Sequence, residues 1–139
     1  MKKLILILMM GCITNTLMAQ NIEKQEPFLV KTLTGETVKQ VEAETSGGNI
    51  SVESVAAGQE RVEVYVWPSQ KNNGGSVSKE QIQAKLDEFY DLKIAVSENK
   101  VTAIAKSKNQ KWSSKNSLSI SFKIFINKNV STQLTTSGG

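Results

Sequence analysis

The clearest fold signal in this sequence is the run LSISFKIFI, which occupies Leu118–Ile126. Five of its apolar side chains recur at every second position, the pattern of a β-strand with one buried face. The run RVEVYVW at Arg61–Trp67 repeats this alternation with three valines on one side, and Pro68 then removes a backbone donor. We expect these two strands to form the centre of a hydrophobic core.

Weaker strand patterns surround these two, at Phe28–Leu33, Val38–Glu44, Asn49–Val55, Leu92–Ser97, Val101–Ala105 and Ser131–Thr136. Glu98 and Asn99 separate two of them, a short connection that suits a tight hairpin because asparagine tolerates a left-handed backbone. Alternation through most of the chain predicts a mainly β fold. The strands are expected to pack either as a right-handed β-solenoid or as sandwich-like sheets.

One amphipathic helix is expected within this β pattern, as an insertion near residues 78–91. Ser78 is placed to cap the free amide groups of the first turn while Gln81 reciprocates, the arrangement called a capping box. Apolar residues then recur at helical spacing, at Ile82, Leu86 and Phe89. This apolar face favours packing against the chain's own strands over binding to a partner.

A short repeat organises the remainder of the sequence. Thr-Ser-Gly-Gly ends both Glu44–Gly48 and Thr135–Gly139, in each case after a strand-like segment. Because the first copy leads directly into Asn49–Val55, its glycines should form a corner between two strands where a side chain would not fit. The expected structural glycines are Gly47, Gly48, Gly138 and Gly139. A second corner predicts a further unit after Gly139; the alternative is a frayed Gly-Gly terminus.

The segments VEAETSGGNISV at Val41–Val52 and SISFKIFINKNV at Ser119–Val130, with the second Ser-Gly-Gly, resemble an uncharacterised bacterial family of adhesin-like β-strand-repeat proteins. The resemblance covers roughly Val38–Gly139. It implies an exported right-handed β-solenoid, of which this chain is an N-terminal fragment, and it implies no catalytic residues. Asn127 stands where such proteins often have proline, and the helix is an insertion on the plain repeat.

The first 19 residues have the pattern of an export signal. Lys2 and Lys3 provide a positive start, and Leu4–Met10 provides an apolar run too short to cross a membrane. Ala19 offers a small residue at the cleavage position, before Gln20. We therefore divide the chain into a signal peptide (1–19), an N-terminal extension with the first strand (20–36) and a β-strand-repeat domain (37–139).

Cys12 suggests an alternative to simple export. In a lipoprotein signal, a cysteine that follows a small residue is acylated and becomes the new N-terminus, and here Gly11 precedes Cys12. Methionines at the two preceding positions match that signal poorly, so we favour cleavage after Ala19. Lipidation at Cys12 would instead make this protein a membrane-anchored accessory subunit of an envelope complex.

Composition excludes most enzyme chemistries. In 139 residues there is no histidine and one cysteine, so the chain has no imidazole base, no Ser-His or Cys-His pair and no ordinary zinc site. Without Lys2 and Lys3, the chain has 15 basic and 13 acidic residues, and this balance of charge is too even for nucleic-acid binding. We expect no catalytic residues, cofactor or metal. The competing class is a glycan-processing enzyme with two carboxylates across a cleft.

The best candidate for binding is the outward row of the Arg61–Trp67 strand, formed by Arg61, Glu63, Tyr65 and Trp67. Rigid aromatic rings beside hydrogen-bonding groups stack on sugars or anchor a protein partner. Alternatively, the helix near 78–91 folds over this row and buries both rings, and Phe125 is a second exposed ring or a further helix contact. The sequence thus predicts an exported, adhesin-like binding or structural module whose partner is a surface glycan or an envelope protein.

Overall fold

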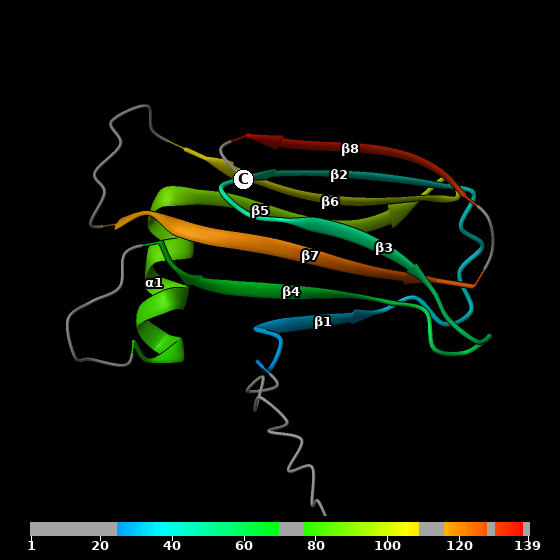
Figure 1. Cartoon of the computed structure of the whole chain (residues 1–139), viewed down its shortest axis with the longest axis horizontal. Helices are drawn as coiled ribbons and strands as arrows, with labels where there is room; N and C mark the ends of the chain where they lie inside the picture. The colour runs from blue at the N-terminus through cyan, green and yellow to red at the C-terminus, as the bar shows by residue number, and fades with distance from the viewer. Residues whose placement is uncertain (1–24, 70–76, 109–115, 128–129, 138–139) are drawn as a thin grey trace, which may run out of the picture.

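A computed structural model describes residues 25–69, 77–108, 116–127 and 130–137 (Figure 1). The strands are β1 (Leu29–Thr32), β2 (Gln40–Ser46), β3 (Ile50–Ser54), β4 (Arg61–Pro68), β5 (Tyr90–Ser97), β6 (Lys100–Ser107), β7 (Leu118–Ile126) and β8 (Ser131–Ser137), and the helix is α1 (Lys79–Phe89). They form two four-stranded mixed sheets, ordered β1-β4-β7-β3 (the first sheet) and β5-β6-β2-β8 (the second sheet).

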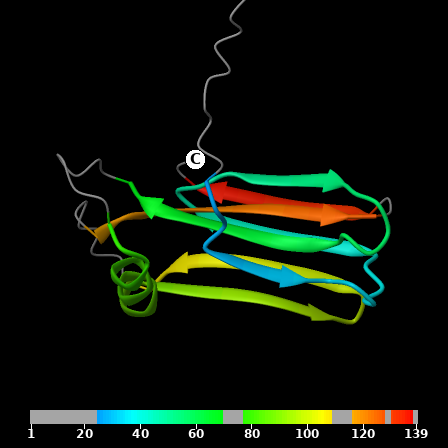
Figure 2. The same cartoon turned by 90° about the horizontal axis from the view of Figure 1, so that it is seen from below.

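The expectation of a mainly β fold is confirmed. The two sheets lie face to face in a sandwich-like arrangement with the one short helix at one end (Figures 1 and 2). Strands pair in parallel between β2 and β6, β2 and β8, and β3 and β7, whereas β4 is antiparallel to both β1 and β7. No solenoid is detected in the described ranges, so the sandwich-like alternative is the one that matches.

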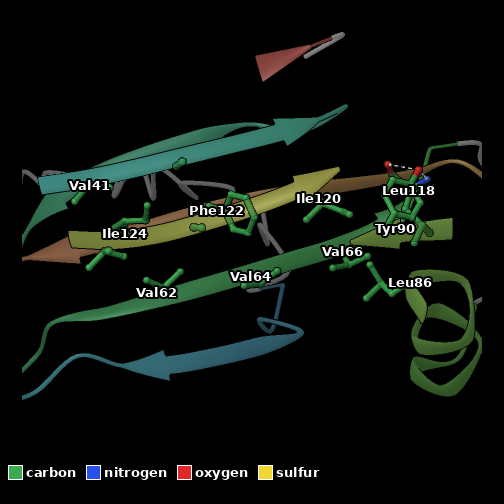
Figure 3. Close-up of a cluster of buried hydrophobic side chains, with 14 of the residues drawn as sticks. Val41, Val62, Val64, Val66, Leu86, Tyr90, Leu118, Ile120, Phe122 and Ile124 are labelled. Carbon is green, nitrogen blue, oxygen red and sulfur yellow. Dashed lines mark hydrogen bonds between the residues drawn. The ribbon is translucent and has the colours of Figure 1, made fainter. Parts of the chain in front are cut away.

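The core lies between the sheets, where the alternating residues predicted from the sequence meet. The inward side chains of β4 and β7 are almost fully buried, among them Val62, Val64, Ile120, Phe122 and Ile124 (Figure 3). They face the small inward residues of the second sheet, such as Ala43 and Ala103. Burying several side chains of this size contributes about 1.5–3 kcal/mol each, which is how a domain without a disulfide is held together.

Helix α1 closes one end of this core. Its N-terminus has the predicted capping box, in which Ser78 and Gln81 exchange side-chain and backbone hydrogen bonds of 3.1 and 3.2 Å. Ile82 and Leu86 are buried in the same cluster as Val66, and Figure 3 shows Leu86 pointing at it. The helix therefore packs against the inner layer at the end of the sheets.

The first Ser-Gly-Gly motif joins the two sheets. Gly47 has a φ of +85°, and a Cβ atom on Gly48 would lie 1.9 Å from the carbonyl oxygen of Ile120. That carbonyl also accepts a 2.5 Å hydrogen bond from the Thr45 hydroxyl, and the Asn49 amide donates to the Ser121 hydroxyl at 2.9 Å. Glycine stands at both positions because the chain turns here in close contact with β7.

Several sequence-based predictions fall outside the described residues. These are the signal peptide at 1–19, its cleavage between Ala19 and Gln20, lipidation at Cys12, and the second glycine pair, Gly138 and Gly139. Among the residues that are described, no helix is long and apolar enough to span a membrane.

Candidate functional site

The outer face of the first sheet carries a shallow hollow of about 670 Å³, which we call the Trp67 hollow. Its lining comes from three neighbouring strands, from the connection before β3 and from the segment before β1: Gln25, Glu26, Pro27, Asn49, Ser51, Arg61, Glu63, Tyr65, Trp67, Ser121, Phe122 and Lys123. The volume lies within the range of small-molecule sites in proteins, which is about 300–1,000 Å³. All four residues of the predicted binding row belong to it.

Strand alternation places this row on the outer face. Because the valines of β4 point into the core, the side chains between them point outward. In the register of the sheet, Tyr65 lies opposite Ser121 of β7, and Glu63 lies opposite Lys123. Ser51 of β3 follows next to Lys123, so polar groups from three strands flank the two rings.

Glu63 is the centre of a small hydrogen-bonded network. Its carboxylate accepts one bond of 2.7 Å from Arg61 Nε and one of 2.5 Å from the Tyr65 hydroxyl, and 13% of its side chain is exposed. Burial by itself raises the pKa of Glu63, but the bonds from Tyr65 and Arg61 and the charge of Lys123 outweigh it. The net pKa of Glu63 is lowered, so this group stays ionised at neutral pH.

The same network acts on Tyr65. Burial, followed by the hydrogen bond to the Glu63 carboxylate and the charge of that group, raises the pKa of Tyr65 to about 12. The Lys123 ammonium lies 5.2 Å from the centre of the Tyr65 ring, within range of a cation–π contact. The hydroxyl is therefore a fixed donor, and the ring is held between charged groups.

Phe125 has a different environment from the one expected. The Arg61 guanidinium lies 3.9 Å from the centre of its ring, and 9% of the residue is exposed. Phe125 is thus buried beneath Arg61, and it is neither a second exposed ring nor a contact of the helix. It fixes the position of Arg61, which in turn orients Glu63.

The expectation that the helix covers the binding row is wrong. Residues of α1 are absent from the lining of the Trp67 hollow in the described chain, because the apolar face of α1 is used in the core. Tyr65 and Trp67 are half-buried, and they share the lining of the hollow with residues of neighbouring strands and of the segment Gln25–Pro27. That segment is held by a 2.7 Å hydrogen bond from the Phe28 amide to the Val64 carbonyl.

Sequence reasoning missed the residues that come from other parts of the chain. Glu26 brings a second carboxylate to the hollow that Glu63 also lines, and nothing in the irregular segment before β1 indicated it. Ser51 contributes a buried hydroxyl with no hydrogen-bond partner among the described residues. No group of three or more acidic, histidine or cysteine side chains that could hold a metal is found in the described ranges.

Comparison with known proteins gives no match: no family model, no curated protein and no solved structure is similar to this chain. The resemblance to the adhesin-like family therefore stays a prediction. What can be argued about function comes from the geometry and chemistry of the Trp67 hollow.

Proposed function

We propose that this protein is an exported, non-catalytic binding module of the cell envelope that binds a surface glycan in the Trp67 hollow. The observation that carries the proposal is the grouping of two half-buried aromatic rings, Tyr65 and Trp67, with hydrogen-bonding groups in one shallow depression. Pyranose rings present apolar C–H faces and polar edges, so such a surface matches them.

Polar groups around the rings are suited to sugar hydroxyls. The Lys123 side chain is exposed and supplies donors, while the fixed Glu63 carboxylate supplies acceptor capacity. The export pattern of residues 1–19 and the adhesin-like resemblance both support an encounter with envelope glycans.

The test is binding of the purified protein to a panel of bacterial surface polysaccharides, measured by titration calorimetry. We expect Trp67→Ala to weaken binding at least tenfold while Trp67→Phe, which keeps a ring, loses less. Val30→Ala is a matched control, because Val30 is exposed on the same sheet but does not line the hollow. Unchanged affinity of Trp67→Ala would contradict the proposal, and so would binding to an envelope protein with no glycan bound.

A second function is favoured by one observation, the presence of both Glu26 and Glu63 in the hollow. Two carboxylates about 5–10 Å apart are the machinery of glycoside hydrolysis. Because Glu63 is held ionised by Arg61 and Tyr65, it would be the nucleophile or stabilising charge and Glu26 the acid. Release of reducing ends from a bound glycan, abolished by Glu26→Gln and by Glu63→Gln, would establish this enzyme class and overturn the non-catalytic proposal.

A further inference from the structure

We infer that the Trp67 hollow takes an amino sugar, whose ammonium group meets the Trp67 ring and the Glu26 carboxylate. The inference rests on the proposed glycan binding and names the chemical class of the glycan. Both groups line the hollow, and within the described ranges neither one has a charged partner from the protein.

The two basic side chains of the hollow are already engaged within the protein. The Arg61 guanidinium bonds the Glu63 carboxylate at 2.7 Å and lies 3.9 Å from the centre of the Phe125 ring. The Lys123 ammonium lies 5.2 Å from the centre of the Tyr65 ring, and its charge helps to lower the pKa of Glu63. An acidic sugar would have to compete with these contacts for either cation.

The charges around the hollow favour a cationic ligand. Its lining has two acidic and two basic side chains: Glu26, Glu63, Arg61 and Lys123. Glu53 follows Ser51 by two residues on β3, so it lies on the same outer face, and its charge helps to raise the pKa of Tyr65. With Glu53, three carboxylates and two cations surround the rings in the described chain.

Trp67 is the ring of the hollow that no protein cation covers in the described chain. The Tyr65 and Phe125 rings of the same face carry Lys123 and Arg61. Trp67 is half-buried, so part of its ring faces the hollow. Among side-chain rings, indole attracts a cation most strongly, so a sugar ammonium finds its best aromatic partner there.

Glu26 supplies the matching negative charge. The segment before β1 passes over β7 and β4 on the outer face of the first sheet (Figure 2), and this brings the carboxylate to the hollow. Glu26 is exposed, and its side chain has no hydrogen bond or ion pair among the described residues. Hydrogen bonds between charged groups are roughly twice as strong as neutral ones, so an ammonium gains more here than a neutral sugar substituent.

The experiment compares an oligomer of glucosamine with the fully N-acetylated oligomer of the same length, by titration calorimetry at mildly acidic pH. We expect the free amine to bind at least about tenfold more tightly, because acetylation removes the charge and keeps the sugar ring. Glu26→Gln should abolish this preference without lowering Tm. Glu88→Gln is the matched control and should keep the preference, since Glu88 is an exposed carboxylate of α1 outside the hollow.

Lys123→Gln tests the sign of the ligand charge. It should tighten binding of the glucosamine oligomer, because it removes a cation that repels the ammonium and keeps a hydrogen-bond donor. An oligomer of galacturonic acid, which carries carboxylates in place of amines, should bind more weakly than the glucosamine oligomer.

The amino-sugar assignment would be overturned by equal affinity for the free and acetylated oligomers, by an unchanged preference in Glu26→Gln, or by tighter binding of the galacturonic acid oligomer. In each of these cases the glycan proposal itself stands if Trp67→Ala still weakens binding. Failure of all three oligomers to bind also overturns the assignment. The polysaccharide panel then decides separately whether the hollow binds glycans.

Discussion

Gly48 shows most directly how one residue sets the path of the chain between the sheets. Its missing side chain leaves room for the carbonyl of Ile120, which already bonds the Thr45 hydroxyl. Backbone atoms of a central strand cannot withdraw from a new Cβ without breaking their own hydrogen bonds to neighbouring strands. The close approach therefore requires glycine on steric grounds, whereas Gly47 is required by its positive φ.

We predict that Gly48→Ala lowers the free energy of unfolding by about 2–4 kcal/mol, because overpacking against β7 forces the corner to move. Urea denaturation followed by circular dichroism measures this loss. Gly58→Ala is the control for a change without a steric clash, since Gly58 has open space around it and, unlike Gly48, a positive φ. Its cost should be about 1–2 kcal/mol from backbone strain alone. An equal or smaller loss for Gly48→Ala would contradict the contact with Ile120.

The Glu63–Tyr65 pair predicts a pH dependence at both ends of the scale. The pKa of Glu63 lies below its ordinary value of 4.5, so its contribution to stability is present above that pH and is lost as the pH falls. The pKa of Tyr65 is raised to about 12, so its contribution is present below pH 10 and is lost as the pH rises through 12.

Ultraviolet absorbance titration should show a tyrosine ionising near pH 12, and Tyr65→Phe should remove this step. Glu63→Gln should move the step toward its ordinary value of 10, because the carboxylate charge that opposes ionisation is gone. A step unmoved by Glu63→Gln would mean that burial alone causes the shift.

At the scale of single elements, local signals in the sequence were sufficient to predict the strands and the helix. The eight expected strands are present, and the β5–β6 turn has positive φ at both Glu98 and Asn99, as a tight two-residue hairpin requires. The helix was expected near residues 78–91 and ends at Phe89. Tyr90, expected in the helix, begins β5 because its hydroxyl accepts a 2.9 Å bond from the Leu118 amide and its backbone pairs with Ser107.

The capping box gives the element-scale prediction. Ser78→Ala should lower the free energy of unfolding by about 1 kcal/mol, since the amide of Gln81 loses its acceptor at the helix N-terminus. Ser78→Thr keeps the acceptor, so its loss of unfolding free energy should be only a few tenths of the Ser78→Ala loss. Urea denaturation measures both losses. A loss below the error of the measurement for Ser78→Ala would show that packing of Leu86 alone holds the helix.

At the scale of the whole molecule, strand neighbours could not be read from the sequence. Alternation tells which side chains of a strand are buried, but the same alternation is compatible with any partner strand. The Ser-Gly-Gly repeat was interpreted as a sign of a solenoid, and the parallel pairing of β2 with β8 was not predicted from it. The antiparallel contacts of β4 with β1 and β7 give the sandwich-like arrangement instead.

The residues of the candidate site were likewise predictable only in part. Its row on β4 was predictable because residues two apart on a strand share a face, and that rule needs no knowledge of the fold. Ser51, Lys123 and Glu26 reach the Trp67 hollow from β3, β7 and the segment before β1. Residues so far apart in sequence share no local pattern, so only the pairing of the strands reveals them.

The sequence by itself determined the strands, the helix, the glycines of the first corner (Gly47 and Gly48) and the outward row that carries Tyr65 and Trp67. Each depends on side-chain period, capping or backbone conformation within a few residues. The tertiary structure decided the order of the strands, the position of the helix against the core and the burial of Phe125 under Arg61. Those outcomes depend on which distant surfaces fit together, a choice made by the packing of the whole core.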